Sequence, residues 1–254
     1  MDPAFKFIIL PLALSLTITA NAQTTKSVNY FTSIKNYDLS KLWCADSIQA
    51  EGDGDKLAFP EPLGYIGDNF QRFYIHYISI TKGKDNPYQY SAYGKSRVKE
   101  NVCIFNGVIT ITKAVLYKES DNPKYKQGSV ICDVTFYEDS TKGSSGIIKG
   151  KLTTDFYLDK NGKIHYDALM FVADGYDNNQ CNATWTNYKT GKSKKCNWGD
   201  FRMPDSKELD NGVGDVSINE KYIKNGWETF VAAYGADKIK GKKALQLEDA
   251  KWWK

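Results

Sequence analysis

The chain has 254 residues, 25% of them charged, and a formal net charge of +4 at pH 7. Its Lys and Asp residues are interspersed rather than grouped in blocks, which argues against a nucleic-acid partner. The length suits one large β domain or a domain with an appendage. The 17 Tyr residues favour strands, or a surface that binds sugars or proteins.

The N-terminal segment has the pattern of a signal peptide. Lys6 precedes an apolar run over residues 7–20, which is too short to span a bilayer. The run ends in Ala20-Asn21-Ala22, a small-x-small pattern that signal peptidase cleaves. We therefore expect a signal peptide over residues 1–22 and a mature chain that starts at Gln23. The protein is then exported, periplasmic or secreted, and not membrane-spanning.

The cysteines predict one disulfide. There are 5 of them, an odd number, so at least one thiol stays unpaired. Cys181 and Cys196 enclose a short Trp-containing segment, and we expect them to be bonded in an oxidising compartment. Cys103 and Cys132 lie on the apolar side of expected strands, where they either bond or pack as small hydrophobic residues.

In chain order, three regions follow the signal peptide. Residues 23–70 predict an irregular lead-in, with a short helix through Leu42 and an extended connection over Pro60–Gly64. Residues 71–204 predict an antiparallel β domain, and residues 205–254 a loop and helices packed on it. Strands are expected over residues 72–80, 88–98, 102–115, 128–138, two hairpin arms within 146–173, 181–189 and 196–203. Within the third of these strands, Asn106-Gly107 predicts either a bulge or a tight hairpin.

The strongest local pattern is a β-hairpin over residues 146–173, with its turn at Lys160-Asn161-Gly162. Apolar residues alternate with polar ones in both arms, as a half-buried strand requires. A three-residue loop with Gly162 in the left-handed conformation places Leu158 opposite Ile164 and Phe156 opposite Tyr166. Phe156 and Tyr166 are then expected in the core.

These elements predict a mainly β fold. About eight strands with short turns are typical of an antiparallel up-and-down meander, which must close to satisfy its edges. We expect a calycin-like barrel or a two-sheet sandwich with the C-terminal helices packed on it. The architecture resembles that of calycins at this coarse level. The Gly-x-Trp that lipocalins carry near their first strand is absent, and the nearest match, Ala183-Thr184-Trp185, comes late in the chain.

The hairpin also suggests an acidic site. In the chosen register Asp155 faces Asp167, and His165 lies beside them. Two facing carboxylates are unfavourable unless they are solvated, protonated or bridged by a cation. The functional interpretation is a metal site or an acid–base pair. The structural alternative is a solvated outer face on which Lys149 and Lys151 neutralise the carboxylates.

Other chemistry has little support in the sequence. Three loops mix acids with Gly or Asn, as Ca²⁺ sites do, but none has EF-hand spacing. They cover residues 51–55, 174–179 and 210–215. No metal ligand is assigned, and no other cofactor is expected. There are 2 His residues, and neither Gly-x-Ser-x-Gly nor His-Glu-x-x-His occurs. Binding is therefore a better hypothesis than catalysis.

The aromatic run over residues 176–201 is the candidate binding surface. Rings beside amides and charges offer stacking area and directional hydrogen bonds. The candidate residues are Tyr176, Trp185, Tyr188, Trp198 and Phe201.

The sequence supports three hypotheses for the function. The first hypothesis is a non-catalytic binding protein for a glycan or an apolar small molecule. The alternative partner is an envelope protein, as for an inhibitor or an immunity protein against a periplasmic toxin. The second alternative is a carboxylate-based hydrolase. Trp185 and Trp198 could instead simply fill the core.

Overall fold

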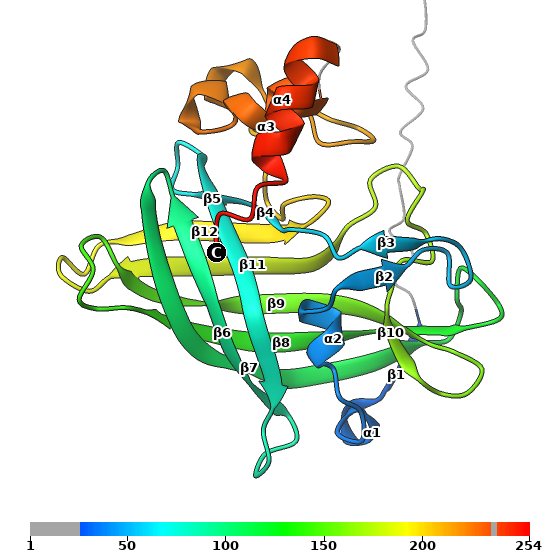
Figure 1. Cartoon of the computed structure of the whole chain (residues 1–254). Helices are drawn as coiled ribbons and strands as arrows, with labels where there is room; N and C mark the ends of the chain where they lie inside the picture. The colour runs from blue at the N-terminus through cyan, green and yellow to red at the C-terminus, as the bar shows by residue number, and fades with distance from the viewer. Residues whose placement is uncertain (1–25, 235–237) are drawn as a thin grey trace, which may run out of the picture.

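In the computed structural model, which describes residues 26–234 and 238–254, eight antiparallel strands form a closed ring (Figure 1). Each pairs with the next ring member along the chain, and β12 pairs with β4 to close the ring. The ring strands are β4 (Leu63–Ile66), β5 (Gln71–Lys82), β6 (Gln89–Val98), β7 (Asn101–Tyr117), β8 (Lys126–Glu138), β9 (Gly146–Leu158), β11 (Asn178–Asn187) and β12 (Ser193–Asp200). The predicted up-and-down meander and its closure are confirmed.

Shorter elements surround this ring. The additional strands are β1 (Ser27–Asn29), β2 (Ser47–Gln49), β3 (Lys56–Ala58) and β10 (Ile164–Tyr166). The helices are α1 (Phe31–Ile34), α2 (Ser40–Trp43), the 3₁₀ helix η1 (Glu220–Asn225), α3 (Glu228–Tyr234) and α4 (Lys238–Glu248). Within the described residues, none of these helices has the length and apolar character needed to cross a membrane. The predicted signal peptide over residues 1–22 lies outside the described residues.

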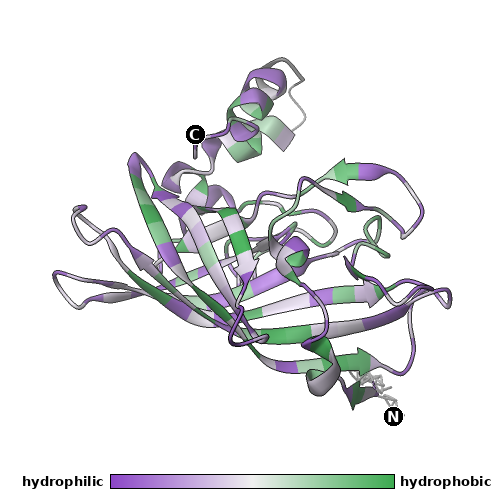
Figure 2. Ribbon diagram, turned by 60° about the horizontal axis from the view of Figure 1, so that its bottom comes forward, coloured by the Kyte–Doolittle hydropathy of each residue, from purple (hydrophilic) through white to green (hydrophobic). Residues whose placement is uncertain are grey.

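The core lies inside the ring. Hydrophobic and hydrophilic residues alternate along the strands (Figure 2), as expected when one face of a sheet is buried. Three aromatic side chains pack together in the interior: the ring centroids of Phe105 and Phe136 are 4.9 Å apart, and those of Phe136 and Trp198 are 6.3 Å apart. Gly107 allows β8 to approach closely, since a Cβ atom there would lie 2.1 Å from Thr135 O.

The hairpin register is confirmed. Leu158 lies opposite Ile164, and Phe156 lies opposite Tyr166. Phe156 and Tyr166 are buried in the core. Gly162 has φ +74°, the left-handed conformation that the three-residue loop requires. The return arm is shorter than predicted, because β10 ends at Tyr166 and the chain then leaves the sheet. Met170 and Val172, which continue the apolar alternation of this arm in the sequence, are exposed.

Two strand predictions need correction. Residues 63–66, expected within the irregular lead-in and its extended connection, form β4, which lies between β5 and β12. The predicted return arm lies outside the ring, so β4 completes the eight ring strands in its place. β7 runs without a break through Asn106-Gly107, so neither the bulge nor the tight hairpin predicted there occurs. Its register irregularity lies further on, between Ile111 and Lys113.

The predicted Cys181–Cys196 disulfide is wrong. Both thiols are free and buried inside the ring. The register explains why: Cys181 lies opposite Trp198, and Cys196 lies opposite Ala183. The two cysteines are therefore diagonal rather than facing neighbours. Cys103 and Cys132 are also free and buried, and they pack as small hydrophobic side chains.

A seam runs between β5 and β12. β4 has only 4 residues, and it pairs with β5 through Gly64–Phe73, Tyr65–Arg72 and Ile66–Gln71 alone. From Tyr74 onward, the β5 edge on this side has no strand partner in the described part of the chain. Helix α2 packs against β5 instead, and Cys44 Sγ donates to Tyr77 O at 3.4 Å. We call this place the seam.

The C-terminal helices pack on the outer side of β4 and β5, where they form a second hydrophobic core (Figure 1). Tyr65, Tyr222, Trp227 and Phe230 are buried in that core. α4 is also held by an ion pair between Arg72 Nη2 and Glu248 Oε2, 3.1 Å long, whose two side chains are less than one-tenth exposed. The C-terminal segment is thereby placed next to the seam.

Candidate functional site

A large cavity lies at the seam, with a volume of about 1130 Å³. Ile75 and Tyr77, which point into the ring, line it together with Tyr74 and His76, which point outward. The cavity therefore passes the free edge of β5 from the ring interior to the outer surface. Its walls are rich in aromatic side chains. These are Trp43, Phe59, Tyr74, Tyr77, Trp198, Phe201, Phe230, Tyr234, Trp252 and Trp253.

A buried hydrogen-bond network closes the inner end of the cavity. Trp43 Nε1 donates to Thr154 Oγ1 at 2.7 Å, and Thr154 Oγ1 donates to Asn179 Oδ1 at 2.8 Å. Asn179 Nδ2 in turn donates to Asp200 Oδ2 at 2.7 Å. Tyr166 Oη donates to the same oxygen at 3.0 Å. The network thus holds Asp200 in one orientation, at the wall of the cavity.

Two buried polar atoms at this end have no hydrogen-bond partner among the described residues: Asp200 Oδ1 and Tyr77 Oη. Both residues line the cavity. Burial raises the pKa of the Asp200 carboxyl to about 8, so this group is mostly protonated at pH 7. Burial also raises the pKa of Tyr77 well above its usual value. Unpartnered buried polar atoms are costly, and a ligand with matching groups would satisfy both.

The backbone beside this network is unusual. Asn179 and Phe201 adopt φ values of +50° and +64°, in the left-handed region that residues other than glycine rarely enter. The β11–β12 register also shifts between Asn178 and Cys181. Such an irregularity redirects a side chain, and here the Asn179 side chain reaches the buried Asp200. Backbone strain of this kind often accompanies functional sites.

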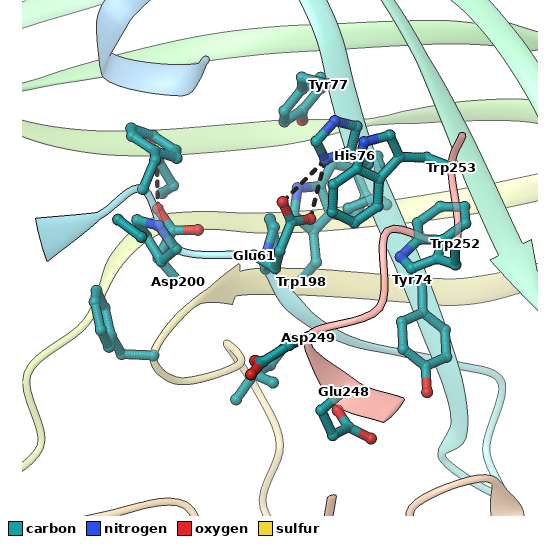
Figure 3. A pocket seen from close by; sticks show the side chains of 18 of the residues that line it. Glu61, Tyr74, His76, Tyr77, Trp198, Asp200, Glu248, Asp249, Trp252 and Trp253 are labelled. Carbon is teal, nitrogen blue, oxygen red and sulfur yellow. Dashed lines mark hydrogen bonds and ion pairs between the residues drawn. The ribbon is translucent and has the colours of Figure 1, made fainter. Parts of the chain in front are cut away.

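The outer end of the cavity combines charge with stacked rings. His76 Nδ1 lies 3.0 Å from each carboxylate oxygen of Glu61. The His76 ring stacks on Trp253, with centroids 3.7 Å apart and an interplanar angle of 14°. Figure 3 shows Asp200 on one side of the cavity and the His76–Trp253 stack on the other, with Glu61 between them. Trp252 packs edge-on against Tyr74, with a centroid distance of 5.9 Å.

The five predicted binding residues do not form one surface. Trp198, which is 1% exposed, and Phe201 line the cavity. The Tyr176 ring packs against Phe201, with centroids 5.2 Å apart, but Tyr176 lines a different, smaller pocket. Trp185 lies away from the cavity and donates from Nε1 to the buried Glu138 at 2.8 Å. Tyr188 is exposed and does not line the cavity.

The predicted acidic site is only partly assembled. Asp155 and Asp167 line a pocket of about 240 Å³. Burial raises the pKa of Asp155 to about 7, with a smaller contribution from the Asp167 charge, and burial also raises the pKa of Asp167. His165 does not join them, because its Nε2 lies 3.0 Å from Asp159 Oδ2 and its ring stacks on Tyr157.

Metal binding receives no support from the side-chain geometry. No group of three or more His, Cys, Asp or Glu side chains in residues 26–234 and 238–254 is placed to hold a metal ion. In one of the three acidic loops, Asp210 is already engaged by Arg202 Nη2 and by the backbone N–H groups of Gly212 and Ser217. Ca²⁺ binding at these loops stays a prediction.

The sequence reasoning missed Asp200, Tyr77 and Asn179 as site residues. One signal was present in the sequence. Cys196, Trp198 and Asp200 are alternate residues of one strand, so Asp200 faces the ring interior as the other two do, and an acid lies at the end of a buried face. A carboxyl group in that position must be protonated or paired, which marks it as a candidate functional group. Asn179 carried no comparable signal, since the bulge that redirects it is not visible in the pattern.

Comparisons with protein-family models, with curated proteins and with solved structures find no match to this chain. Function must therefore be argued from the chemistry of the site.

Proposed function

We propose that this chain is an exported, non-catalytic binding protein that holds an apolar, ring-containing small molecule in the seam cavity. The observation that carries the proposal is the cavity itself: about 1130 Å³ of space with aromatic walls and two unpartnered polar atoms at its inner end. Small-molecule sites are typically concave and mostly apolar, with a few polar groups that fix the orientation of the ligand.

The shape of the site favours a small molecule over the other two hypotheses. A protein partner would contact an exposed aromatic surface, whereas Trp198 is fully buried in the ring. A hydrolase built on Asp155 and Asp167 would use the pocket of about 240 Å³, from which His165 is absent. Neither alternative draws support from a specific contact.

Binding of a neutral aromatic probe provides the first test. N-phenyl-1-naphthylamine should bind with saturation at one site per chain and become more fluorescent. It should also quench the emission of Trp residues, since four of the 6 Trp residues line the cavity. Fluorescence titration measures both signals. If wild-type protein shows no saturable binding of any aromatic probe, charged or uncharged, the proposal fails.

A matched pair of variants localises the binding. Ala45 is half-buried and lines the cavity, whereas Ala173 is half-buried and lies outside it. Ala45→Trp should fill part of the cavity and weaken probe binding by about tenfold or more, because overpacking excludes the ligand. Ala173→Trp should leave the affinity unchanged. Circular dichroism confirms that both variants are folded, and equal affinities in folded variants would place the probe elsewhere.

A further inference from the structure

The charge on the cavity walls differs in sign from that of the whole chain. The chain carries a formal charge of +4, but carboxyl groups outnumber basic groups in the cavity lining. The acids are Asp46, Glu61, Asp200, Asp215, Glu248 and Asp249, and the basic side chains other than His76 are Arg72 and Lys251. Arg72 is already paired with Glu248 at 3.1 Å. The surplus of carboxyl groups favours a positively charged ligand.

The inner end of the cavity offers such a ligand a buried acceptor. Asp200 is fully buried, and its Oδ1 has no donor among the described residues, while its Oδ2 accepts from Asn179 and Tyr166. Tyr77 Oη, also unpartnered, lies near enough for the Asp200 charge to raise the pKa of Tyr77. An ammonium group has three N–H donors, and one of them can satisfy Asp200 Oδ1. Aromatic walls add attraction, since ring faces are electrostatically negative.

We propose that the ligand of the seam cavity is an organic cation, in which a primary ammonium group is attached to an apolar ring system. Asp200 is its counter-ion, and the aromatic walls hold the ring system. This inference rests on the proposed function and specifies its ligand class.

The proton on Asp200 sets the pH dependence. The pKa of Asp200 is about 8 in the free protein, so about one-tenth of the molecules carry the carboxylate at pH 7. A cation that pairs with the carboxylate must displace this proton. At pH 7 the cation therefore binds about tenfold more weakly than it does well above pH 8, where the carboxylate is already ionised. Its affinity should therefore rise by about tenfold per pH unit below pH 8 and level off above it. A neutral acceptor would show the reverse, because it needs the protonated acid.

Other titratable groups face Asp200 from the surrounding segments. They are Glu61 from the connection before β4, Tyr77 from β5, Tyr166 from β10 and Tyr176 from the loop before β11. Burial raises the pKa values of these three Tyr residues far above pH 8. Glu61 is bound to His76 at the outer end. The contribution of Asp200 is therefore the difference between the pH dependence of affinity in the wild type and that in Asp200→Asn.

Three probes with the same ring system test the inference: 1-naphthylmethylamine, 1-naphthalenemethanol and 1-naphthylacetate. Isothermal titration calorimetry on the full chain between pH 6 and 8 gives each affinity. At pH 7 the amine should bind about tenfold or more tightly than the alcohol, and the acetate should bind most weakly. The affinity for the amine should rise with pH, while the affinity for the alcohol should not.

Two variants complete the test. Asp200→Asn should weaken amine binding by at least about tenfold and change alcohol binding by less than about threefold, because Asn keeps the shape and a donor. Asp85→Asn, which removes an exposed carboxylate outside the cavity, is the matched control and should have little effect on either. If Asp200→Asn does not fold, the inference is tested by the pH dependence of amine affinity in the wild-type protein, which should rise from pH 6 to 8.

The outcomes separate the two proposals. Equal or tighter binding of the alcohol, or an amine affinity that falls with pH, would overturn the cation assignment and leave the binding function intact. Failure of all three probes and of N-phenyl-1-naphthylamine would overturn both. Amine binding that is preserved in a folded Asp200→Asn variant would also refute the assignment, since the counter-ion would then lie elsewhere.

Discussion

The Asp200→Asn variant should gain stability relative to the wild type as the pH rises from 4 to 8. At pH 4 the two proteins should differ little in free energy of unfolding, because a protonated carboxyl and an amide have nearly the same shape. Above pH 4 the wild type should lose about 1.4 kcal/mol for each pH unit relative to the variant, up to a plateau near pH 8. The accumulated difference is several kcal/mol.

The direction follows from the pKa of Asp200 in the two states. In the unfolded chain the carboxyl ionises near its ordinary value of 3.8, while burial raises the folded-state pKa to about 8. Between these values the folded protein binds one more proton than the unfolded chain, so raising the pH favours unfolding. Below pH 4 both states are protonated and the full stability is present. Above pH 8 both are ionised, and no further change arises from this group.

Urea melts at one-unit steps between pH 4 and 8 measure the effect. Asp155→Asn is a useful companion, because burial raises the pKa of Asp155 to about 7 and its effect should reach its plateau one unit lower. Curves for the wild type and Asp200→Asn that stay parallel across the whole range would mean that Asp200 ionises freely in the folded state. The chemistry assigned to the inner end of the cavity would then be wrong.

The hairpin illustrates what a sequence pattern can predict. Alternation over 146–158 identifies the buried face without any tertiary information, because the side-chain period of a strand is two. The requirement that Phe156 and Tyr166 share this face then selects the three-residue loop over the two-residue turn. The same reasoning predicts a closed meander, since unpaired strand edges must be satisfied.

The seam could not be predicted in this way. β4 has 4 residues and follows two prolines, so its pattern is too short to distinguish a strand from an extended connection. The cavity exists because this strand ends before β5 does, a difference in length that only the paired structure reveals. The aromatic run over residues 176–201 misled for a related reason. Trp185 and Trp198 share the inward face, because Trp198 lies opposite Cys181, but Trp185 lies opposite Lys194, four positions away along β12. The two rings are therefore separated along the strands, which sequence distance does not reveal.

The disulfide prediction was wrong because the strand register, and not the spacing along the chain, determines which residues face each other. Cys181 and Cys196 are both buried, as a structural pair would be, and their strands are adjacent. A bond requires Cβ atoms at about 3.8 Å, which facing residues approach and diagonal ones do not. The turn between β11 and β12 fixes the register of the two strands, and in this register Cys196 faces Ala183, two positions away from Cys181. Spacing along the chain carries no information on that offset.

Phe156→Ala should lower the free energy of unfolding by about 3–5 kcal/mol, as large core truncations do. Phe156 is 0% exposed, lies opposite Tyr166, and has its ring centroid 6.5 Å from that of Tyr30. Lys151→Ala is the matched control on the same strand. Lys151 points outward and forms an exposed ion pair with Asp133 at 2.7 Å, so its removal should cost less than about 0.5 kcal/mol.

Urea melts of both variants at pH 7 give the comparison, and the slope with denaturant shows whether the unfolded reference state is unchanged. The difference between the two variants tests the register and not only burial. A shift of one residue would move Phe156 to the outer face and Lys151 into the ring interior. Lys151→Ala would then relieve a buried charge and stabilise the protein, while Phe156→Ala would cost little. Equal stabilities would contradict the closed ring as well as the hairpin, because Lys151 pairs with both β8 and β11 and Phe156 pairs with β8.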